Sequence, residues 1–261
     1  MSDLQWFLDQ HRVFTWDEFL EELGQDRTEQ TLRTIIRNYL NSQKIGRVKS
    51  GLYYRIKTKD KQSTPDKYLI GSKLAKDAVL GYHTAFEVLG YAHSVSSKVY
   101  VFTNSRVRPI EFQQVKYQPV SPPAPMSNNH TRQIGVEKKE RLGTKVQITN
   151  KERTLVDVLD RPDYTGGLEE LRRCIEKLPY VDFEEVMRYL EQRDKKVLFA
   201  KTGFILEQNR ENWYVKGSWL ETLQAKIPTS PTYFTPEDKG KLNSRWNLIV
   251  PESMYKRIDL T

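Results

Sequence analysis

The first 57 residues constrain the fold more than any other part of the chain, because three amphipathic segments precede two β-prone runs around a glycine. Apolar residues recur at helical spacing in three stretches, near residues 3–11, 14–24 and 27–42. The two β-prone runs flank Gly51, which supplies the positive φ that a tight hairpin needs. Three helices and a hairpin, with a short turn between the second and third helices, predict a winged helix-turn-helix over residues 1–60.

The second helix carries the clearest boundary signals. Thr15 and Glu18 have the spacing of a capping box, and Phe14 and Phe19 have the spacing of a hydrophobic staple. Gly24 is a residue type that commonly ends a helix. These signals place the second helix within residues 14–24, a few residues before the third.

The third helix has a polar face that contains no acidic residue, opposite an apolar stripe that includes Leu32 and Ile36. In a winged helix this helix enters the major groove, where arginine and amide side chains hydrogen-bond base edges, while the wing neutralises phosphates. The predicted base-reading residues are Gln30, Arg33, Thr34, Arg37 and Asn38. The predicted phosphate or minor-groove contacts are Arg47, Lys49, Arg55 and Lys57.

The distribution of charge agrees with this prediction. The whole chain has a formal net charge of +8, but residues 1–26 carry one basic and seven acidic side chains, whereas residues 27–61 carry ten basic and two acidic ones. A second basic block, residues 98–153, carries eleven basic and four acidic side chains. The first block indicates an anionic partner, with double-stranded DNA favoured. The second block fits an extended DNA footprint, RNA or an acidic partner, and a merely solvated surface explains it as well as these three together.

The rest of the chain predicts an α+β protein with a larger second domain. Residues 61–70 are expected to be a linker and residues 71–261 a mixed α/β domain, with an exposed loop near 121–131 that is rich in proline, serine and asparagine. The pattern Thr149–Glu152 predicts a second capping box, at the start of a helix that Pro162 ends. Further helices are expected near 82–90, 167–178, 183–193, 197–208 and 219–224, and strands near 98–104, 108–120, 143–150 and 244–251.

Composition argues against several classes of protein. The single cysteine, Cys174, excludes an intramolecular disulfide, and the four histidines show no metal-ligand spacing. No apolar run approaches the roughly 18 residues of a membrane span, and the acidic start is unlike a signal peptide. We therefore expect a cytoplasmic protein without a metal or cofactor.

Four segments, in order, resemble the AbiEi antitoxin family, the transcription-regulator half of type IV toxin–antitoxin and phage-defence operons. They are KIGRVKSGLYY at 44–54, YHTAFEVLG at 82–90, ITNKERTLVDVLDRPDYTGGLEEL at 148–171 and SRWNL at 244–248. The third is the most specific, and it departs from the family in one place: Asn150 and Lys151 stand where a proline typically follows the capping residue.

The resemblance implies two activities. The winged helix would bind inverted repeats in the promoter of its own operon and repress it, and the larger C-terminal domain would counteract a nucleotidyltransferase-like toxin, by direct contact or indirectly. Operator sequence, toxin and oligomeric state are left open by the sequence.

Two other functional classes are weighed against this one. A winged helix can serve protein contacts without reading DNA. A metal-dependent nuclease would need Glu137-Lys138-Lys139 as half of its site, but no aspartate lies between Asp77 and Asp157 to complete it. We expect no enzyme activity.

The remaining residues with catalytic potential have structural interpretations. Asp157 is expected to pair with Arg153 on a helix surface, with Asp160 one turn further on. Cys174 is expected to be a core or half-exposed thiol, and His83 a packing or capping residue. Gly166 and Gly167 are expected to form a turn into a helix rather than a phosphate loop.

Overall fold

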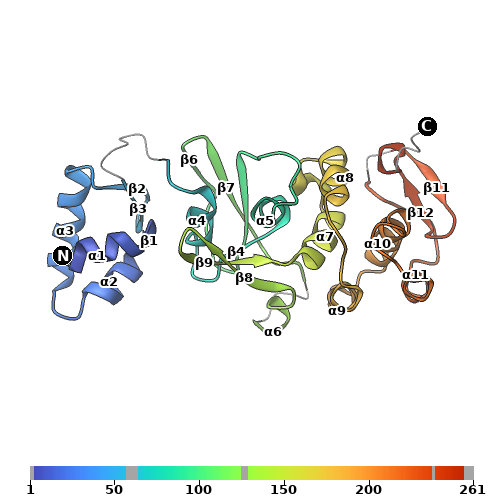
Figure 1. The fold of residues 1–261 in the computed structure, drawn as a ribbon, viewed down its shortest axis with the longest axis horizontal. Coiled ribbons are helices and arrows are strands. Elements are labelled where there is room, and N and C mark those ends of the chain that lie inside the picture. Colours follow the sequence, from blue (N-terminus) through green and yellow to red (C-terminus); the bar gives the residue numbers. More distant parts are fainter. Residues whose placement is uncertain (1–2, 57–63, 125–128, 237–238, 256–261) are drawn as a thin grey trace. The chain divides into compact units, whose positions relative to one another are not determined.

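The computed structural model describes residues 3–56, 64–124, 129–236 and 239–255, and it shows a mixed α+β protein (Figure 1). The chain divides into two compact units. Unit 1 comprises residues 1–80, 97–120 and 138–148, and unit 2 comprises residues 81–96, 121–137 and 149–261. Residues 1–60 lie in unit 1 together with residues 61–80, 97–120 and 138–148, so a separate domain at residues 1–60 stays a prediction.

The N-terminal part of unit 1 contains the three predicted helices and the predicted hairpin, with an additional strand between the first two helices. The elements are α1 (Asp3–Gln10), β1 (Val13–Thr15), α2 (Trp16–Leu23), α3 (Glu29–Asn41), β2 (Ile45–Lys49) and β3 (Leu52–Arg55). The three strands form an antiparallel sheet in the order β1-β3-β2. The predicted hairpin is therefore confirmed, and a third strand, β1, extends it.

Local capping and an aromatic cluster explain why these residues fold as they do. Thr15 and Glu18 form the predicted capping box of α2, and Gly24 caps its C-terminus. The rings of Phe14 and Phe19 stack with centroids 5.8 Å apart, and Phe7 packs edge-on against both. These aromatic side chains are fully buried, so the apolar faces of the helices and the sheet share one core.

A six-stranded sheet forms the remainder of unit 1, with strand order β6-β7-β5-β4-β9-β8. Its strands are β4 (Val79–Leu80), β5 (Lys98–Phe102), β6 (Ile110–Phe112), β7 (Val115–Val120), β8 (Val136–Arg141) and β9 (Thr144–Thr149). Within it, β5 pairs parallel with β7, and β4 pairs parallel with β9. The run 108–120, predicted as one strand, is a hairpin, because Gln113 and Gln114 turn the chain with φ of 48° and 63°.

Helix α4 (Lys67–Ser72) packs on this sheet, so the last four residues of the predicted linker 61–70 are helical. Asp66 caps the helix by accepting hydrogen bonds from the backbone N–H groups of Tyr68 and Leu69. Gly71 lies so close to the sheet that a Cβ there would meet the Val99 side chain at 2.7 Å. Residues 67–70 resemble a linker in sequence because they follow directly on a charged stretch. Residues 57–63 of that stretch lie outside the described residues.

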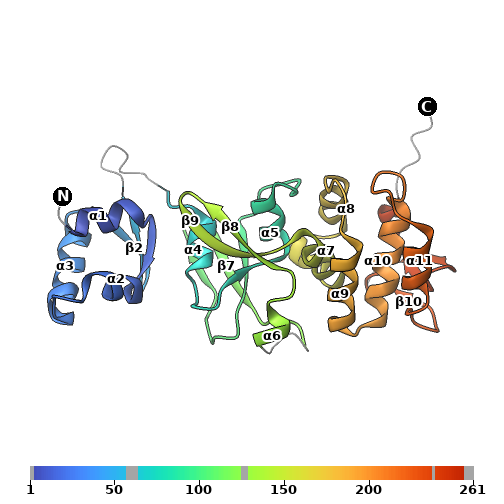
Figure 2. The same ribbon diagram turned by 60° about the horizontal axis from the view of Figure 1, so that its bottom comes forward.

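Unit 2 is built around α7 (Lys151–Asp160), whose residues 152–159 are all buried. The other helices are α5 (Tyr82–Leu89), α6 (Asn129–Arg132), α8 (Leu168–Glu176), α9 (Phe183–Arg193), α10 (Lys196–Gln208) and α11 (Gly217–Gln224), with 3₁₀ turns at Pro162–Thr165 and Glu252–Met254. A small sheet has the order β10-β12-β11, with β10 (Thr232–Tyr233), β11 (Lys241–Asn243) and β12 (Leu248–Val250). Figure 2 shows α10 and α11 side by side.

Two boundary predictions in unit 2 differ from the structure. Asn150, not Thr149, caps α7 through its side chain, and Glu152 accepts a hydrogen bond from the backbone N–H of Asp182 instead of closing a capping box. Of the predicted loop 121–131, residues 125–128 lie outside the described residues, and α6 begins at Asn129. No helix in the described part of the chain combines the length and the apolar character that a membrane crossing requires.

Candidate nucleic-acid interface

The exposed face of α3 carries the predicted base-reading side chains. Gln30, Arg33, Thr34, Arg37 and Asn38 are all exposed, while Leu32 and Ile36 are buried on the opposite side. Within the described chain, the side chains of Gln30, Arg37 and Asn38 make no hydrogen bond or ion pair. Amphipathic spacing thus turns three amide or guanidinium groups toward solvent, where they retain all their donors and acceptors.

Arg33 and Thr34 differ from these three residues because each already has a partner on its own helix or nearby. Arg33 pairs with Glu29 at 2.5 Å, and its guanidinium carbon lies 4.9 Å from the centre of the Trp16 ring. The hydroxyl of Thr34 donates to the backbone carbonyl of Gln30 at 3.0 Å. Reading a base with Arg33 would require breaking its ion pair, so Arg37 is the better candidate of the two arginines.

The hairpin residues separate in the same way. Arg47 is exposed and unpaired within the described chain. Arg55 is bound to α1: its guanidinium pairs with Asp9 at 2.6 Å and donates to the carbonyl of Leu8 at 3.0 Å. Lys57 lies outside the described residues.

Lys49 is half-buried and turned inward. Its ammonium donates to the backbone carbonyl of Leu74 at 3.3 Å, and burial lowers its pKa. Lys49 and Arg55 lie on the hairpin as predicted, but alternation along a strand does not show which long side chain has a partner elsewhere in the fold.

Lys44 is a basic residue of this region that the predicted site omits. It lies between α3 and β2, is exposed, and has its ammonium 5.0 Å from the centre of the Tyr39 ring. Its position directly between α3 and the hairpin is the signal that could have included it.

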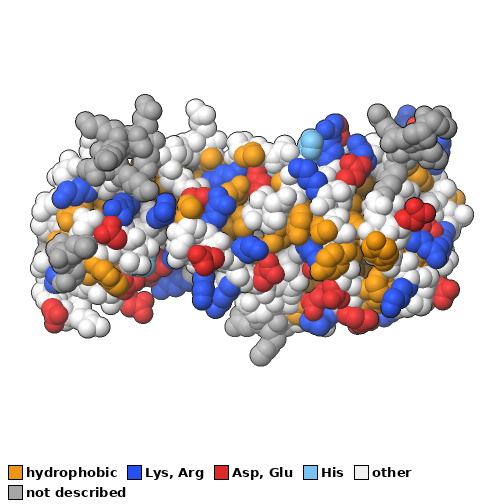
Figure 3. Space-filling model, viewed as in Figure 1, with side chains coloured by type: hydrophobic (Ala, Val, Ile, Leu, Met, Phe, Trp, Pro, Cys, Tyr) orange, Lys and Arg blue, Asp and Glu red, His pale blue; other side chains and the backbone are white. Residues whose placement is uncertain are grey.

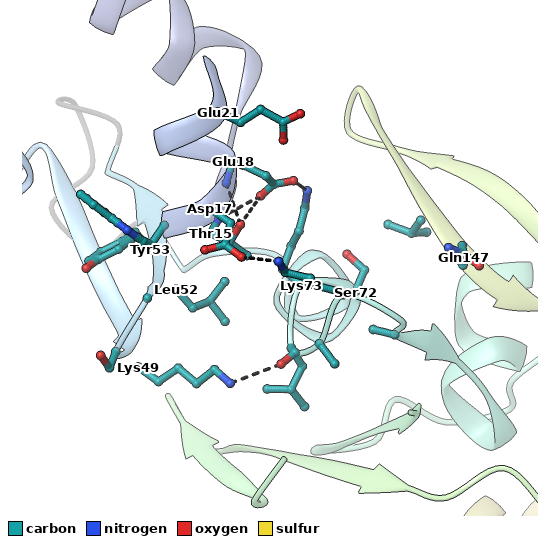
Figure 4. Close-up of a pocket in the computed structure, with 18 of the residues that line it drawn as sticks. Thr15, Asp17, Glu18, Glu21, Lys49, Leu52, Tyr53, Ser72, Lys73 and Gln147 are labelled. Atoms are coloured by element: carbon teal, nitrogen blue, oxygen red, sulfur yellow. Dashed lines mark hydrogen bonds and ion pairs between the residues drawn. The ribbon is translucent and has the colours of Figure 1, made fainter. Parts of the chain in front are cut away.

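A hollow of about 700 Å³ within unit 1 lies beside the N-terminus of α2, the hairpin turn and the segment after α4 (Figure 4). Two ion pairs lie in it: Glu18 with Lys73, and Asp17 with Lys76 at 2.7 Å. Burial raises the pKa of Glu18, but its hydrogen bonds with Lys73 and Thr15 outweigh this and leave the pKa below the usual value. Two of the acidic side chains that line the hollow are therefore already paired with lysines.

The second basic block is not a continuous basic surface. Arg132 is buried, and Arg141 forms a bidentate contact with Asp66 at 2.7 and 2.9 Å. Lys138 and Lys139 are exposed on β8, next to acidic residues of the same strand. Figure 3 shows lysine and arginine side chains scattered among acidic ones on the visible face. Some of the basic side chains of this block are therefore buried or paired within the protein and do not form a free basic surface.

The two aspartates of α7 take part in a buried network, so the prediction of an ion pair on a helix surface is wrong in its location. Asp157 is 1% exposed and contacts Arg153, Arg193 and the hydroxyl of Tyr189. Asp160 pairs with Arg193 at 2.6 Å. Burial raises the pKa of Asp157, while the two guanidinium groups oppose that rise. The network is occupied by protein groups, which gives the aspartates a structural role.

The other residues with catalytic potential have structural surroundings too. Gly166 and Gly167 have φ of 102° and 100° and form the predicted turn into α8. His83 and Cys174 are buried, and burial raises the pKa of the Cys174 thiol to about 12, which makes it a poor nucleophile. Glu137 is exposed on β8 and belongs to no metal-type cluster of the described residues.

The fold and this surface define a mixed α+β protein whose N-terminal helices present unpaired amide and guanidinium groups to solvent. A solved structure described as "Crystal structure of RV2827C protein from Mycobacterium tuberculosis" has a similar fold, with a TM-score of 0.60 over 95% of this chain and 90% of that chain. The two sequences are 18% identical, so the likeness concerns the fold alone. No protein-family model matches the chain, and no curated protein matches it.

Proposed function

We propose that residues 3–56 form a winged helix-turn-helix that reads operator DNA through α3, and that the chain is an AbiEi-type antitoxin repressing its own operon. The observation that carries the proposal is the exposed face of α3, where Gln30, Arg37 and Asn38 are unpaired within the described chain. Guanidinium and amide groups are the side chains that hydrogen-bond guanine and adenine edges in the major groove.

The arrangement of elements supports the same proposal. Three helices precede a two-stranded hairpin, and β1 pairs with its second strand, Val13 opposite Tyr54. In a winged helix the third helix occupies the major groove and the hairpin contacts the backbone. Arg47 on β2 is exposed, and on this proposal it would contact a phosphate.

The test is binding of the full-length protein to the DNA upstream of its gene, compared with a scrambled duplex over a salt series. Arg37→Ala is expected to weaken operator binding by about 1–3 kcal/mol, roughly 5- to 150-fold, and to reduce discrimination at one base pair. Arg47→Ala should weaken both duplexes alike and reduce the salt slope by about 1. Arg210→Ala, at an exposed arginine of unit 2, is the matched control and should leave binding unchanged.

Either of two results contradicts the DNA-reading proposal. One is equal affinity for operator and scrambled DNA; the other is an operator affinity that Arg37→Ala leaves intact. In both cases the N-terminal part is better explained as a protein-interaction module.

The antitoxin half of the proposal rests on the family resemblance, above all on residues 148–171. It is tested by expressing the neighbouring nucleotidyltransferase-like protein alone and with this chain, and by measuring growth. Rescue by the chain with Arg37→Ala would assign neutralisation to a surface other than α3. Growth arrest that the wild-type chain does not relieve would refute this half while leaving the repressor half standing.

A further inference from the structure

We propose that His83, Glu170 and Cys174 form a binding site for a divalent transition-metal ion of the zinc type. The side chains come from α5 and α8 and converge within unit 2. The site is independent of the DNA-binding proposal.

The three ligand atoms already lie close together, because His83 and Cys174 both hydrogen-bond Glu170 Oε1. His83 Nε2 lies 3.0 Å and Cys174 Sγ 3.4 Å from Glu170 Oε1, and all three ligand atoms lie within 4.8 Å of one another. Zinc with bonds of about 2.0–2.3 Å holds tetrahedral ligands roughly 3.3–3.8 Å apart, so the widest pair needs to close by only about 1 Å. Imidazole nitrogen, carboxylate oxygen and thiolate sulfur are the three donor types that zinc takes in proteins.

The surroundings provide the outer contacts that metal sites use. Backbone N–H groups of His93 and Ser94 donate to Glu170 Oε1 at 3.2 and 2.9 Å, which fixes the carboxylate. His83 Nδ1 is buried without a hydrogen-bond partner in the described chain, and the nearest carboxylate oxygen, of Glu87, is 3.7 Å away. A metal on Nε2 would place the ring proton on Nδ1, facing that carboxylate, which is the usual carboxylate–histidine–metal arrangement.

Charge favours a cation at this point. Glu87 and Glu170 flank a single imidazole, with side chains only 3% and 15% exposed. A divalent ion bound at Glu170 would be stabilised by two carboxylates in a poorly solvated place. On binding, the Cys174 thiol would lose its proton to solvent and bind as thiolate, while His83 would bind through the neutral ring.

Sequence spacing predicted no metal, because the three residues lie far apart along the chain. The fold reverses that expectation by bringing α8 against the α5 segment. His93 lies in the segment after α5, and its backbone N–H donates to the Glu170 oxygen that His83 contacts. The ring of His93 faces Arg173 at 2.9 Å, so the ligand cluster is limited to His83, Glu170 and the sole cysteine of the chain.

The experiment is a cobalt titration of the full-length protein after removal of metals with a chelator, followed by competition with zinc. Cys174 is the sole cysteine, so any thiolate-to-cobalt charge-transfer band in the near ultraviolet arises from this residue. We expect the band in the wild type, its loss in Cys174→Ser, and its bleaching by zinc. Glu170→Gln and His83→Gln should each weaken cobalt binding more than tenfold, and Glu87→Gln by about 10- to 100-fold.

Glu169→Gln is the matched control, because Glu169 is adjacent in sequence but exposed and paired with Arg173; it should bind cobalt like the wild type. Absence of the charge-transfer band in the folded wild type overturns the proposal, whatever the variants do. A band whose affinity is unchanged in Glu170→Gln and His83→Gln also overturns it, since it would report a lone thiol. Circular dichroism of each variant confirms that the comparison is between folded proteins.

Discussion

Asp157→Asn is the substitution that best separates what the structure predicts from what the sequence predicts. Asp157 Oδ1 accepts hydrogen bonds from the Tyr189 hydroxyl at 2.5 Å and from Arg193 at 3.1 Å, and Oδ2 faces Arg153 Nε at 3.4 Å. The amide removes the negative charge between two buried guanidinium groups. Arg193 keeps Asp160 as a partner, and Arg153 keeps its hydrogen bonds to the carbonyls of residues 132 and 134 but loses the carboxylate beside its Nε.

The expected magnitude follows from burial. Breaking a buried ion pair by removing one partner costs about 3–5 kcal/mol, because the other charge stays desolvated and uncompensated. An i, i+4 pair on a helix surface contributes only about 0.2–0.5 kcal/mol. The two readings of the same residues therefore differ by roughly tenfold, which is well outside the error of a denaturation experiment.

The assay is urea unfolding at neutral pH, followed by circular dichroism, with thermal unfolding beside it. For a chain of this size, a loss of 3–5 kcal/mol lowers the melting temperature by about 6–20 °C. Asp163→Asn makes the same chemical change at an exposed aspartate of the next turn and should stay within about 0.5 kcal/mol of the wild type. A loss below about 1 kcal/mol in Asp157→Asn would refute the buried network.

Three further predictions concern single side chains. Burial lowers the pKa of Lys201 to about 8, so above that pH the unfolded chain binds more protons than the folded one. Between pH 8 and 10 the free energy of unfolding should therefore rise by about 2 kcal/mol relative to Lys201→Met. Parallel pH profiles of the two proteins would contradict this. The pKa of Glu18 is held below its ordinary 4.5, so the stability that its carboxylate contributes is complete above pH 4.5 and is lost as the pH falls through the lower folded value. Glu18→Gln should therefore reduce the loss of stability in acid, which urea midpoints over the acid range would show. A Cβ on Gly203 would lie 2.1 Å from the Trp246 ring, so Gly203→Ala should destabilise the protein by about 1–3 kcal/mol in thermal unfolding, despite the better helix propensity of alanine. Gly217→Ala is the control, because a Cβ there has its nearest neighbour at 3.9 Å. Equal melting temperatures of the two variants would count against this packing.

Much of the fold could be predicted locally. The helix α2 follows from Thr15, Glu18 and Gly24 because caps act within one turn and need no distant partner. The hairpin of β2 and β3 follows from Gly51, whose φ is 76°. Likewise, the apolar stripe of α3 determines by itself which of its side chains face solvent.

Pairings between distant segments could not be predicted from such patterns. Arg55 looks like a wing cation in sequence, but it pairs with Asp9, and Arg33 faces Trp16 on another helix. Residues 67–70 look like a linker in sequence because β5, the strand on which α4 packs, lies about thirty residues later.

The sequence by itself therefore determined the order of the N-terminal elements, the exposed face of α3 and the sign of its charge, because these depend on periodicity and caps within a few residues. Only the tertiary structure decided which charged side chains are exposed and unpaired, and which are buried or paired with another residue. Asp157 is buried among arginines from two helices, and His83, Glu170 and Cys174 lie within 4.8 Å of one another. The physical reason is that desolvation and coordination depend on what lies nearby in space, and packing brings together residues that are up to ninety positions apart in the chain.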